Sequence, residues 1–314
     1  MVVLIVVNQA DIASTNQADA LLGLVTWNPL SDVDGHRASS CKHVRMWWIP
    51  TGVLYEDHLD LRWEAATGEN VDEVIFPSRH AAASGQASLT LHPIGVPHLE
   101  SGERGKYGGV GGTAPPPNPR LAPWWRKLNR LATARSELSG FDLSLETTHH
   151  GPCLNSPSLF IEVGSTDATW GHLPAAQLLA EIMVEGLGLI GDEVTSWNAE
   201  SHAGQLVVVT LGGGHYAPRG NNLGLHEGVW LGHMLASYAL PFVQTEGEPE
   251  GNWKQSIDAA ISATREAFPE GYLVVSMDKK AFRGWQRQAI RDHLEVLDIP
   301  LLTTKQILAR LETA

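Results

Sequence analysis

Residues 146–170 read ETTHHGPCLNSPSLFIEVGSTDATW. Two adjacent histidines, His149 and His150, precede a Gly-Pro turn, and the apolar run at 160–163 carries one acid, Glu162, in its middle. Such a run predicts a short buried strand. A carboxylate inside a buried strand must be paired, protonated or bound to a metal, because its desolvation is otherwise too costly. The stretch therefore predicts a strand that leads into a functional site.

The composition is that of a globular protein with a sizeable core. The chain has 314 residues, of which 43% are hydrophobic. The apolar run that follows Met1 stops at Asn8, without a basic leader, and fits a first buried strand better than a membrane span or a signal peptide. The two cysteines, Cys41 and Cys153, form no Cys-x-x-Cys pair. We therefore expect a cytoplasmic protein without a disulfide framework or a membrane anchor.

Strand-like and helix-like runs alternate along most of the chain. The patterns predict strands at 2–7, 44–49, 59–63, 71–80, 88–92, 141–145, 160–163, 205–211 and 272–276, and helices at 11–24, 123–132, 174–186, 226–239, 252–267 and 279–297. This alternation predicts an α/β fold with a mixed, largely parallel sheet and helices on both faces. We expect a single domain over 1–314, with a peripheral region at 26–70 and a Gly/Pro-rich loop at 102–119.

Histidines gather at the predicted strand ends. The chain has 14 histidines, and five of them stand at a strand end or in the turn after it, namely His80, His92, His149, His150 and His215. Strand ends on one edge of an α/β sheet share a crevice, so some of these side chains are expected to converge. In an ideal strand adjacent histidines point to opposite faces. Both His149 and His150 can serve one site only if the Gly-Pro turn bends the backbone.

The residue types in this crevice leave three kinds of chemistry open. Neutral imidazoles together with Glu162 could bind zinc, although no His-Glu-x-x-His spacing is present. General-base catalysis by a histidine without a metal is the alternative. Residues 212–214 are glycines whose backbone amides could face an oxyanion or a phosphate, or could simply form a tight turn. Cys153 beside the histidines raises a third reading, a Cys-His nucleophile.

The net charge of −13 argues against a generally sticky polyanion-binding surface, but basic residues are clustered. Between 104 and 135 there are seven and no acid: Arg104, Lys106, Arg120, Arg126, Lys127, Arg130 and Arg135. A second set recurs every four residues along a predicted helix: Lys279, Arg283, Arg287 and Arg291. Both sets could bind phosphates or form solvated faces, and Trp124-Trp125 could stack on a base or pack in the core.

Several sequence blocks, in this order, resemble one known family. They are Asp11-x-Ala-Ser, Phe76-Pro-Ser-Arg-His80, Ser88-Leu-Thr-Leu-His92-Pro-Ile-Gly, Glu146-x-Thr-His149-His150-Gly-Pro, Pro157-Ser-x-Phe-Ile-Glu162-Val-Gly-Ser-Thr166, Trp170 and Gly212-Gly-Gly-His215-Tyr-Ala-Pro. Together they resemble the D-aminoacyl-tRNA deacylases of the archaeal and plant type, the Geko-like family. Val96 and Cys153 depart from the family's usual Asn and Thr. The Cys153 departure disfavours a thiol nucleophile, since the family works without a thiol there.

The resemblance implies a function and a fold. It implies hydrolysis of the ester that joins a D-amino acid to the tRNA 3′ end, and a fold similar to that of peptidyl-tRNA hydrolases and purine nucleoside phosphorylases. It also implies zinc and a tRNA acceptor end as the partner. The sequence itself indicates no obligate protein partner. Two rivals remain, a zinc-dependent amidase or peptidyl-tRNA hydrolase and a non-catalytic tRNA-binding protein.

On this reading a water held by zinc, His150 or His215 attacks the ester carbonyl. The candidate catalytic residues and metal ligands are His149, His150, Glu162 and His215. The candidate substrate-binding residues are Ser78, Arg79, His80, His92, Thr166, Gly212, Gly213, Gly214, Tyr216, Arg126, Lys127, Arg130, Lys279 and Arg283. Amides of the glycine turn would hold the oxyanion, and the two basic sets would bind acceptor-stem phosphates.

Overall fold

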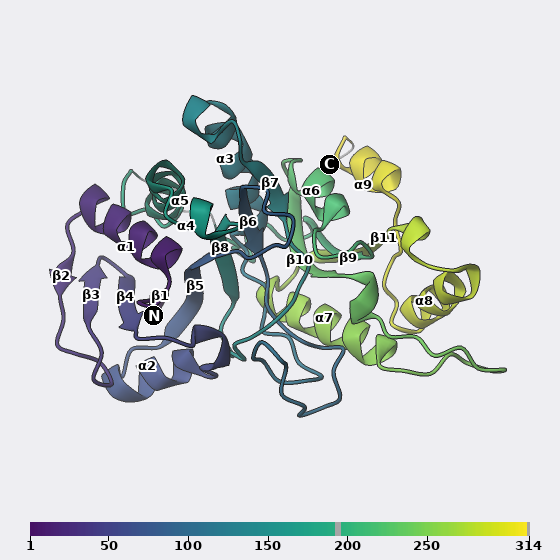
Figure 1. Cartoon of the computed structure of the whole chain (residues 1–314). Helices are drawn as coiled ribbons and strands as arrows, with labels where there is room; N and C mark the ends of the chain where they lie inside the picture. The colour runs from purple at the N-terminus through teal and green to yellow at the C-terminus, as the bar shows by residue number, and fades with distance from the viewer. Residues whose placement is uncertain (192–195, 313–314) are drawn as a thin grey trace.

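A computed structural model describes residues 1–191 and 196–312 of the chain (Figure 1). The described strands form two sheets. The larger has the order β2-β3-β4-β1-β5-β8-β6-β7, and the smaller has the order β10-β9-β11. The strands are β1 Val2–Asn8, β2 Asn28–Pro29, β3 Ala38–Cys41, β4 Val44–Ile49, β5 Val71–Arg79, β6 Ser88–His92, β7 Asp142–Leu145, β8 Ser158–Gly164, β9 Leu206–Leu211, β10 Val229–Leu235 and β11 Tyr272–Met277.

The helices complete an α/β architecture. They are α1 Ile12–Leu24, α2 Leu59–Thr67, α3 Leu121–Thr133, α4 Asp167–Trp170, α5 Leu173–Gly186, α6 Pro218–Gly224, α7 Trp253–Ala267, α8 Gly284–Val296 and α9 Thr304–Leu311. Short 3₁₀ turns lie at Val53–Tyr55, Ser136–Leu138, Ser237–Ala239 and Lys279–Ala281. None of the helices in the described ranges is long and apolar enough to cross a membrane.

Alternation along the first strand explains why helices cover both faces of the larger sheet. Residues 3, 5 and 7 of β1 belong to the apolar cluster that includes α1, α3 and α5. Residues 2, 4 and 6 belong to the cluster on the other face, which includes Leu59 and Trp63 of α2. Successive side chains of a strand point to opposite faces, so a wholly apolar strand needs cover on both. Figure 1 shows α1 and α5 on one side of this sheet and α2 on the other.

The expected sheet character is confirmed, but the strands are divided over two sheets. In the larger sheet β1, β5 and β8 run parallel, whereas β6 pairs antiparallel with β8. In the smaller sheet β9 pairs parallel with both β10 and β11. One apolar cluster includes residues of both sheets, with Trp125 and Leu128 of α3 among them. Helix α3 therefore packs between the two sheets.

The position of α3 corrects the expected basic face and the expected base-stacking tryptophans. Trp124 and Trp125 are buried, so they pack in the core. Lys127 is also buried, with its Nζ 2.6 Å from Glu185 Oε2. Arg126 lies 3.1 Å from Glu227 and donates to the carbonyl of Gly224. Because neighbouring elements cover the polar side of α3 as well, Arg126 and Lys127 do not form an open phosphate-binding face there, although Arg130 is exposed.

Three predicted elements are wrong. Residues 59–63 form part of helix α2 rather than a strand, and 229–235 form strand β10 rather than a helix. All seven residues of β10 are buried, and a short buried strand has no periodicity that distinguishes it from a buried helix. Helix α8 begins at Gly284 and not at 279, so Lys279 belongs to a separate 3₁₀ turn and the four-residue ridge is not one helical face.

Strand β10 holds the segment before the histidine pair in place through His233. The fully buried His233 Nδ1 lies 3.0 Å from Thr148 Oγ1, and its Nε2 lies 3.0 Å from the carbonyl of Pro115. The hydroxyl of Thr148 accepts a hydrogen bond from the Met234 amide, which leaves its own proton for Nδ1. Burial lowers the pKa of His233 to about 4, and the hydrogen bond to Pro115 only partly opposes this. The residue is therefore a neutral structural histidine.

This burial predicts a pH-dependent contribution to stability. Between pH 6.5 and 4 the unfolded chain binds a proton at residue 233 and the folded protein does not, so the contribution is complete above pH 6.5 and is lost as the pH falls towards 4. The pKa difference corresponds to roughly 3 kcal/mol. The free energy of unfolding, measured with urea at several pH values, should fall less for His233→Gln than for the wild type between pH 6.5 and 4. Parallel pH profiles for the two proteins would contradict the assignment.

Candidate active site

A pocket of about 440 Å³ lies where β1, β5 and β8 end. In open α/β sheets, ligand sites lie at the carboxyl ends of the parallel strands. The lining residues are Asn8, Asp11, Val53, Leu54, Ser78, Arg79, His80, Ala81, Tyr107, His149, His150, Glu162 and His215. The pocket therefore contains all four predicted catalytic residues, His149, His150, Glu162 and His215, together with an apolar wall.

All five strand-end histidines meet at this place. His80 follows β5, His92 ends β6, His149 and His150 follow β7, and His215 follows β9 of the smaller sheet. The ring centroids lie 4.2 Å apart for His92 and His149, 4.6 Å for His149 and His215, and 5.3 Å for His80 and His215. The convergence expected from the strand ends is thus present, and both sheets contribute to it.

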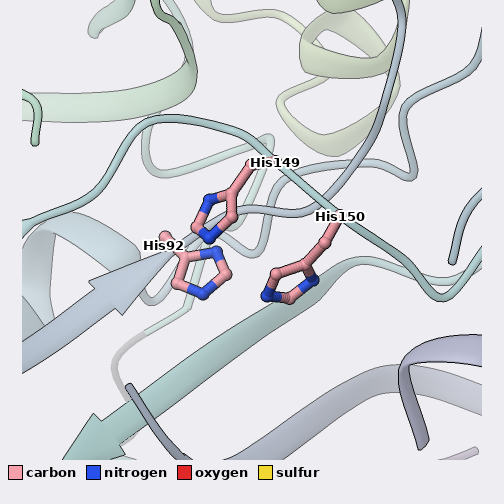
Figure 2. Close-up of side chains that lie close together, drawn as sticks. All are labelled: His92, His149 and His150. Atoms are coloured by element: carbon pink, nitrogen blue, oxygen red, sulfur yellow. The ribbon is translucent and has the colours of Figure 1, made fainter. Parts of the chain in front are cut away.

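A bend in the backbone brings the two adjacent histidines to one side. His150 has a φ of 43°, in the left-handed region that residues other than glycine rarely adopt. The rings of His149 and His150 consequently lie 4.4 Å apart, at 71° to each other. Figure 2 shows both rings, with His92, grouped around a common centre. This backbone conformation costs on the order of 1 kcal/mol and orients the ring of His150. Such strain is common at functional sites.

Backbone carbonyls fix which nitrogen of these three histidines is free. His92 Nδ1 lies 3.1 Å from the carbonyl of Pro93, His149 Nδ1 lies 2.7 Å from that of Thr147, and His150 Nδ1 lies 2.7 Å from that of Gly151. A carbonyl can only accept, so each Nδ1 carries the proton. In the neutral rings Nε2 is then the unprotonated atom. One ring nitrogen of each of the three lies within 4.8 Å of one in each of the others, an arrangement suited to holding a cation.

The most buried acid of the site is Glu146. It stands in one of the sequence blocks but is not among the predicted site residues. Its side chain has no exposed surface. Its oxygens lie 2.7 Å from His215 Nε2, 3.0 Å from His80 Nδ1 and 3.6 Å from His149 Nε2. Although burial favours the neutral acid, the contacts with His215 and His80 dominate and hold the pKa of Glu146 well below its usual value. Glu146 is therefore an anion surrounded by imidazoles.

The expectation that buried Glu162 must have partners is confirmed. The hydroxyl of Thr90 donates to Glu162 Oε2 at 3.4 Å, and the same oxygen lies 3.6 Å from His92 Nε2 and 3.7 Å from His80 Nδ1. The two carboxylates thus flank the histidine cluster from different strands. Glu162 comes from β8 and Glu146 from the segment after β7.

The environment separates the protonation states of the histidines. Burial lowers the pKa of His150 to about 3 and that of His149 well below its usual value, and the charge on neighbouring histidines adds to the effect. Burial opposes charge on His80 and His92 as well, but Glu146 and Glu162 outweigh it and raise the pKa of both rings. The pocket therefore contains neutral imidazoles that can act as bases or ligands beside imidazoles that favour a proton.

Asp11 organises the rim of the pocket. Its carboxylate accepts from the amides of Ala13 and Ser14, which makes it the N-cap of α1, and from the Arg79 amide at 2.9 Å. Burial raises the pKa of Asp11, and these hydrogen bonds offset part of the effect. The guanidinium of Arg79 lies 4.7 Å from the ring centre of Trp170 and is exposed at the rim. One acid thus ties the start of the helix to the strand end that carries Arg79 and His80.

The apolar wall of the pocket corrects the interpretation of region 26–70 as peripheral. Val53 and Leu54 line the pocket together with Tyr107 of the Gly/Pro-rich loop. The strand β4 from the same region pairs with β1 in the sheet. The mixture of tryptophans, acids and polar residues in this region shows no clear period. No local sequence signal places Leu54 against the distant loop 102–119.

Several candidate residues do not line the pocket. They are Thr166, Gly212, Gly213, Gly214, Tyr216, Arg126, Lys127, Arg130, Lys279 and Arg283. His92 is also absent from the lining and lies behind the histidines that form it. Thr166 caps α4, and the Gly212 amide already donates to the carbonyl of Leu235, so it does not serve as an oxyanion donor. The Tyr216 hydroxyl reaches His80 Nε2 at 3.3 Å. Burial raises the pKa of Cys153, which also lies outside the lining.

Close backbone packing holds the apolar wall and gives a testable contrast between two glycines. Gly102 and Gly108 both have a positive φ in the same loop, so alanine strains either by about 1 kcal/mol. A Cβ on Gly108 would lie 1.6 Å from the carbonyl oxygen of Leu54, whereas one on Gly102 meets nothing within 4 Å. Gly108→Ala should therefore lower the melting temperature by several degrees more than Gly102→Ala. Equal losses in thermal unfolding would show that the wall is not tightly packed.

Comparison with known proteins shows the family to which the chain belongs. A protein of Arabidopsis thaliana named D-aminoacyl-tRNA deacylase is 46% identical over 305 residues, covering 94% of this chain and 96% of the relative. One of the same name from Methanothrix thermoacetophila is 29% identical and covers 97% and 98%. A crystal structure of a conserved protein of unknown function superposes with a TM-score of 0.78 at 25% identity, over 98% and 96% of the two chains. Residues 67–302 match the family model described as D-aminoacyl-tRNA deacylase, and the chain belongs to that family.

Proposed function

We propose that the pocket hydrolyses the ester bond between a D-amino acid and the 3′ end of tRNA, releasing both. The observation that carries the proposal is the cluster of imidazoles around buried Glu146, at the end of a pocket with an apolar wall. Ester hydrolysis needs an activated water and a group that returns a proton to the leaving hydroxyl. The family membership and the names of the relatives support the same reaction.

The donor set fits a zinc ion. The ring nitrogens of His92, His149 and His150 form one candidate group, and His80, Glu146 and His215 form another. Buried His92 Nε2, His215 Nε2 and both Glu146 oxygens lack a well-aligned hydrogen-bond partner within the described ranges, although ring nitrogens lie close to the carboxylate. Histidines whose other nitrogen donates to a carbonyl are typical zinc ligands. Zinc held there would supply a bound water with a pKa near 7 and polarise the ester carbonyl.

The chain's own groups would position the substrate and move its proton. His215 is partly exposed, with 40% of its side chain accessible, and its Nε2 lies against Glu146. This contact leaves Nδ1 to exchange a proton with the leaving hydroxyl. Val53, Leu54 and Tyr107 would receive the amino-acid side chain, and their fixed wall would distinguish its two configurations. Arg79 at the rim would bind the phosphate of the terminal nucleotide.

Single-turnover deacylation of matched D- and L-aminoacyl-tRNA tests the function. The proposal predicts rapid release from the D form and slow release from the L form, because the wall and the cluster fix where the α-carbon substituents lie. An N-acylated aminoacyl-tRNA in the same assay tests the amidase or peptidyl-tRNA hydrolase alternative. Turnover of that substrate in preference to the D-ester would replace the proposal. Salt-sensitive tRNA binding without any turnover would favour a binding protein.

Chelation tests the metal part of the proposal. Removal of zinc with a chelator should abolish D-specific activity, and added zinc should restore it, since a ring nitrogen from each of three histidines faces one centre. Activity that persists in protein shown by elemental analysis to be metal-free would assign water activation to a histidine instead.

A pair of histidine variants tests the site itself. His150→Asn should lower the single-turnover rate by about 100-fold or more, because general-base and ligand residues contribute at least this much. His98→Asn is the matched control, since burial also lowers the pKa of His98 but the ring lies outside the pocket lining. Equal rates in the two variants would remove His150 from the mechanism. Circular dichroism and thermal unfolding would confirm that both variants are folded.

A further inference from the structure

A second pocket, of about 650 Å³, lies at the carboxyl end of β11 and is lined by an unusual number of cations. They are Arg219 from α6, Lys279 and Lys280 from the turn after β11, Arg291 from α8 and Lys305 from α9. The single carboxylate of the lining is Asp278, which accepts a hydrogen bond from the Lys280 amide. On a chain with a net charge of −13, this is a local concentration of positive charge.

The cations of this basic groove are available to a ligand. Lys279, Lys280, Arg291 and Lys305 are exposed, and none of them forms an ion pair with another residue in 1–191 or 196–312. Surface lysines in this chain do pair where an acid is near, as Lys254 does with Glu248. The groove therefore gathers like charges that repel one another, a cost that an anionic ligand would relieve.

Arg219 is held in place at the base of the groove. Its Nη1 donates to Thr304 Oγ1 at 2.8 Å and to Ser276 Oγ at 3.3 Å, and its Nη2 lies 4.0 Å from Asp278. Its Nε is buried without a hydrogen-bond partner among the residues that the structure describes. Two hydroxyls thus fix the guanidinium while part of its donor capacity is unused. A fixed guanidinium with free donors suits an oxyanion.

The strand order places this groove at the expected ligand position of the smaller sheet. The chain passes from β9 to β10 on one side and then returns to β11 on the other side of β9. Adjacent parallel strands whose connections leave in opposite directions form a crevice at their carboxyl ends. Here that crevice lies between the turn after β9, which leads to His215, and the turn after β11. In Figure 1 the helices α8 and α9 flank β11 at the end of the molecule away from β5.

The groove is connected to the active site by very few residues. A Cβ on Gly212 would lie 2.9 Å from Ala281 and 3.0 Å from Asp278, so the glycine turn packs directly on the turn that carries the lysines. Arg219 follows His215 by four residues, and an extended chain of that length spans at most about 14 Å. An RNA strand whose 3′ end enters the histidine pocket could therefore pass over the groove.

We infer that the basic groove binds backbone phosphates of the tRNA substrate, upstream of the esterified nucleotide. The inference rests on the proposed function and adds the surface that holds the nucleic acid. The groove has a volume of about 650 Å³, and its five cations come from four separate elements, which suits successive phosphates of a strand better than one small anion. The lining offers no exposed aromatic ring for a base, so the binding is independent of sequence.

Binding of uncharged tRNA tests the inference without relying on catalysis. Lys280→Ala/Lys305→Ala is compared with Lys254→Ala/Arg265→Ala, which removes the same charge from α7, outside the groove lining. Fluorescence anisotropy at several salt concentrations gives the affinity and its salt slope. The groove variant should bind tRNA about tenfold more weakly. The slope of log affinity against log salt concentration should be smaller in magnitude by roughly 1 to 2, since each phosphate contact contributes about 0.7 to 0.9 to that slope. The control should bind as the wild type does.

Two outcomes would overturn the inference. In the first, the groove variant and the control bind tRNA with equal affinity and equal salt slopes. In the second, inorganic phosphate binds the wild type and not the groove variant in calorimetry, while tRNA affinity is unchanged, so that the ligand is a free anion. Neither readout depends on hydrolysis. If the protein does not hydrolyse D-aminoacyl-tRNA but its tRNA binding still depends on the groove, the proposed function is rejected and the groove remains a tRNA-binding surface.

Discussion

The burial of Glu146 is the constraint on which the site depends. A carboxylate with no exposed surface must be neutral or surrounded by groups that favour its charge. Here the surrounding groups are imidazoles, and they come from segments that follow β5, β7 and β9. Because β9 belongs to the smaller sheet, the charge of Glu146 is stabilised only when both sheets are in place. The packing of α3 between the sheets is therefore as important to the site as the site residues themselves.

The electrostatics of the cluster follow from the balance between burial and the two carboxylates at each ring. Burial and the charge on His92 keep His149 and His150 neutral, and for His150 the hydrogen bond from Nδ1 to the Gly151 carbonyl opposes this only in part. Where a carboxylate is the neighbour, as for His80, the ring favours a proton. One cluster thus provides bases or ligands and acids side by side without a change in residue type. Burial and the distance to the two carboxylates decide which ring has which character.

Sequence patterns predicted the α/β class, the strand-end histidines and the buried acid in β8, because each depends on local periodicity or on strand topology. They failed at β10, where seven consecutive buried residues carry no period, and at α2, whose short run was ambiguous. Glu146 was missed because it stands at a strand end, where an acid is usually solvated, and only the partners from distant segments make it exceptional. Lys127 was misplaced for the converse reason, since only the tertiary packing of α3 buries its charge. The apolar wall around Leu54 depends on a contact between segments about fifty residues apart, and the sequence has no signal for it.

The measurement that tests the central claim most directly is the protonation of the histidine rings, observed by NMR of protein labelled with ¹⁵N at histidine. At neutral pH and without metal, His149 and His150 should be neutral with the proton on Nδ1, because each Nδ1 faces a backbone carbonyl. Added zinc should then shift the Nε2 resonances of these rings and leave Nδ1 protonated. Rings that carry the proton on Nε2, or Nε2 resonances that do not respond to zinc, would contradict the account of the cluster as a site of free, converging nitrogens.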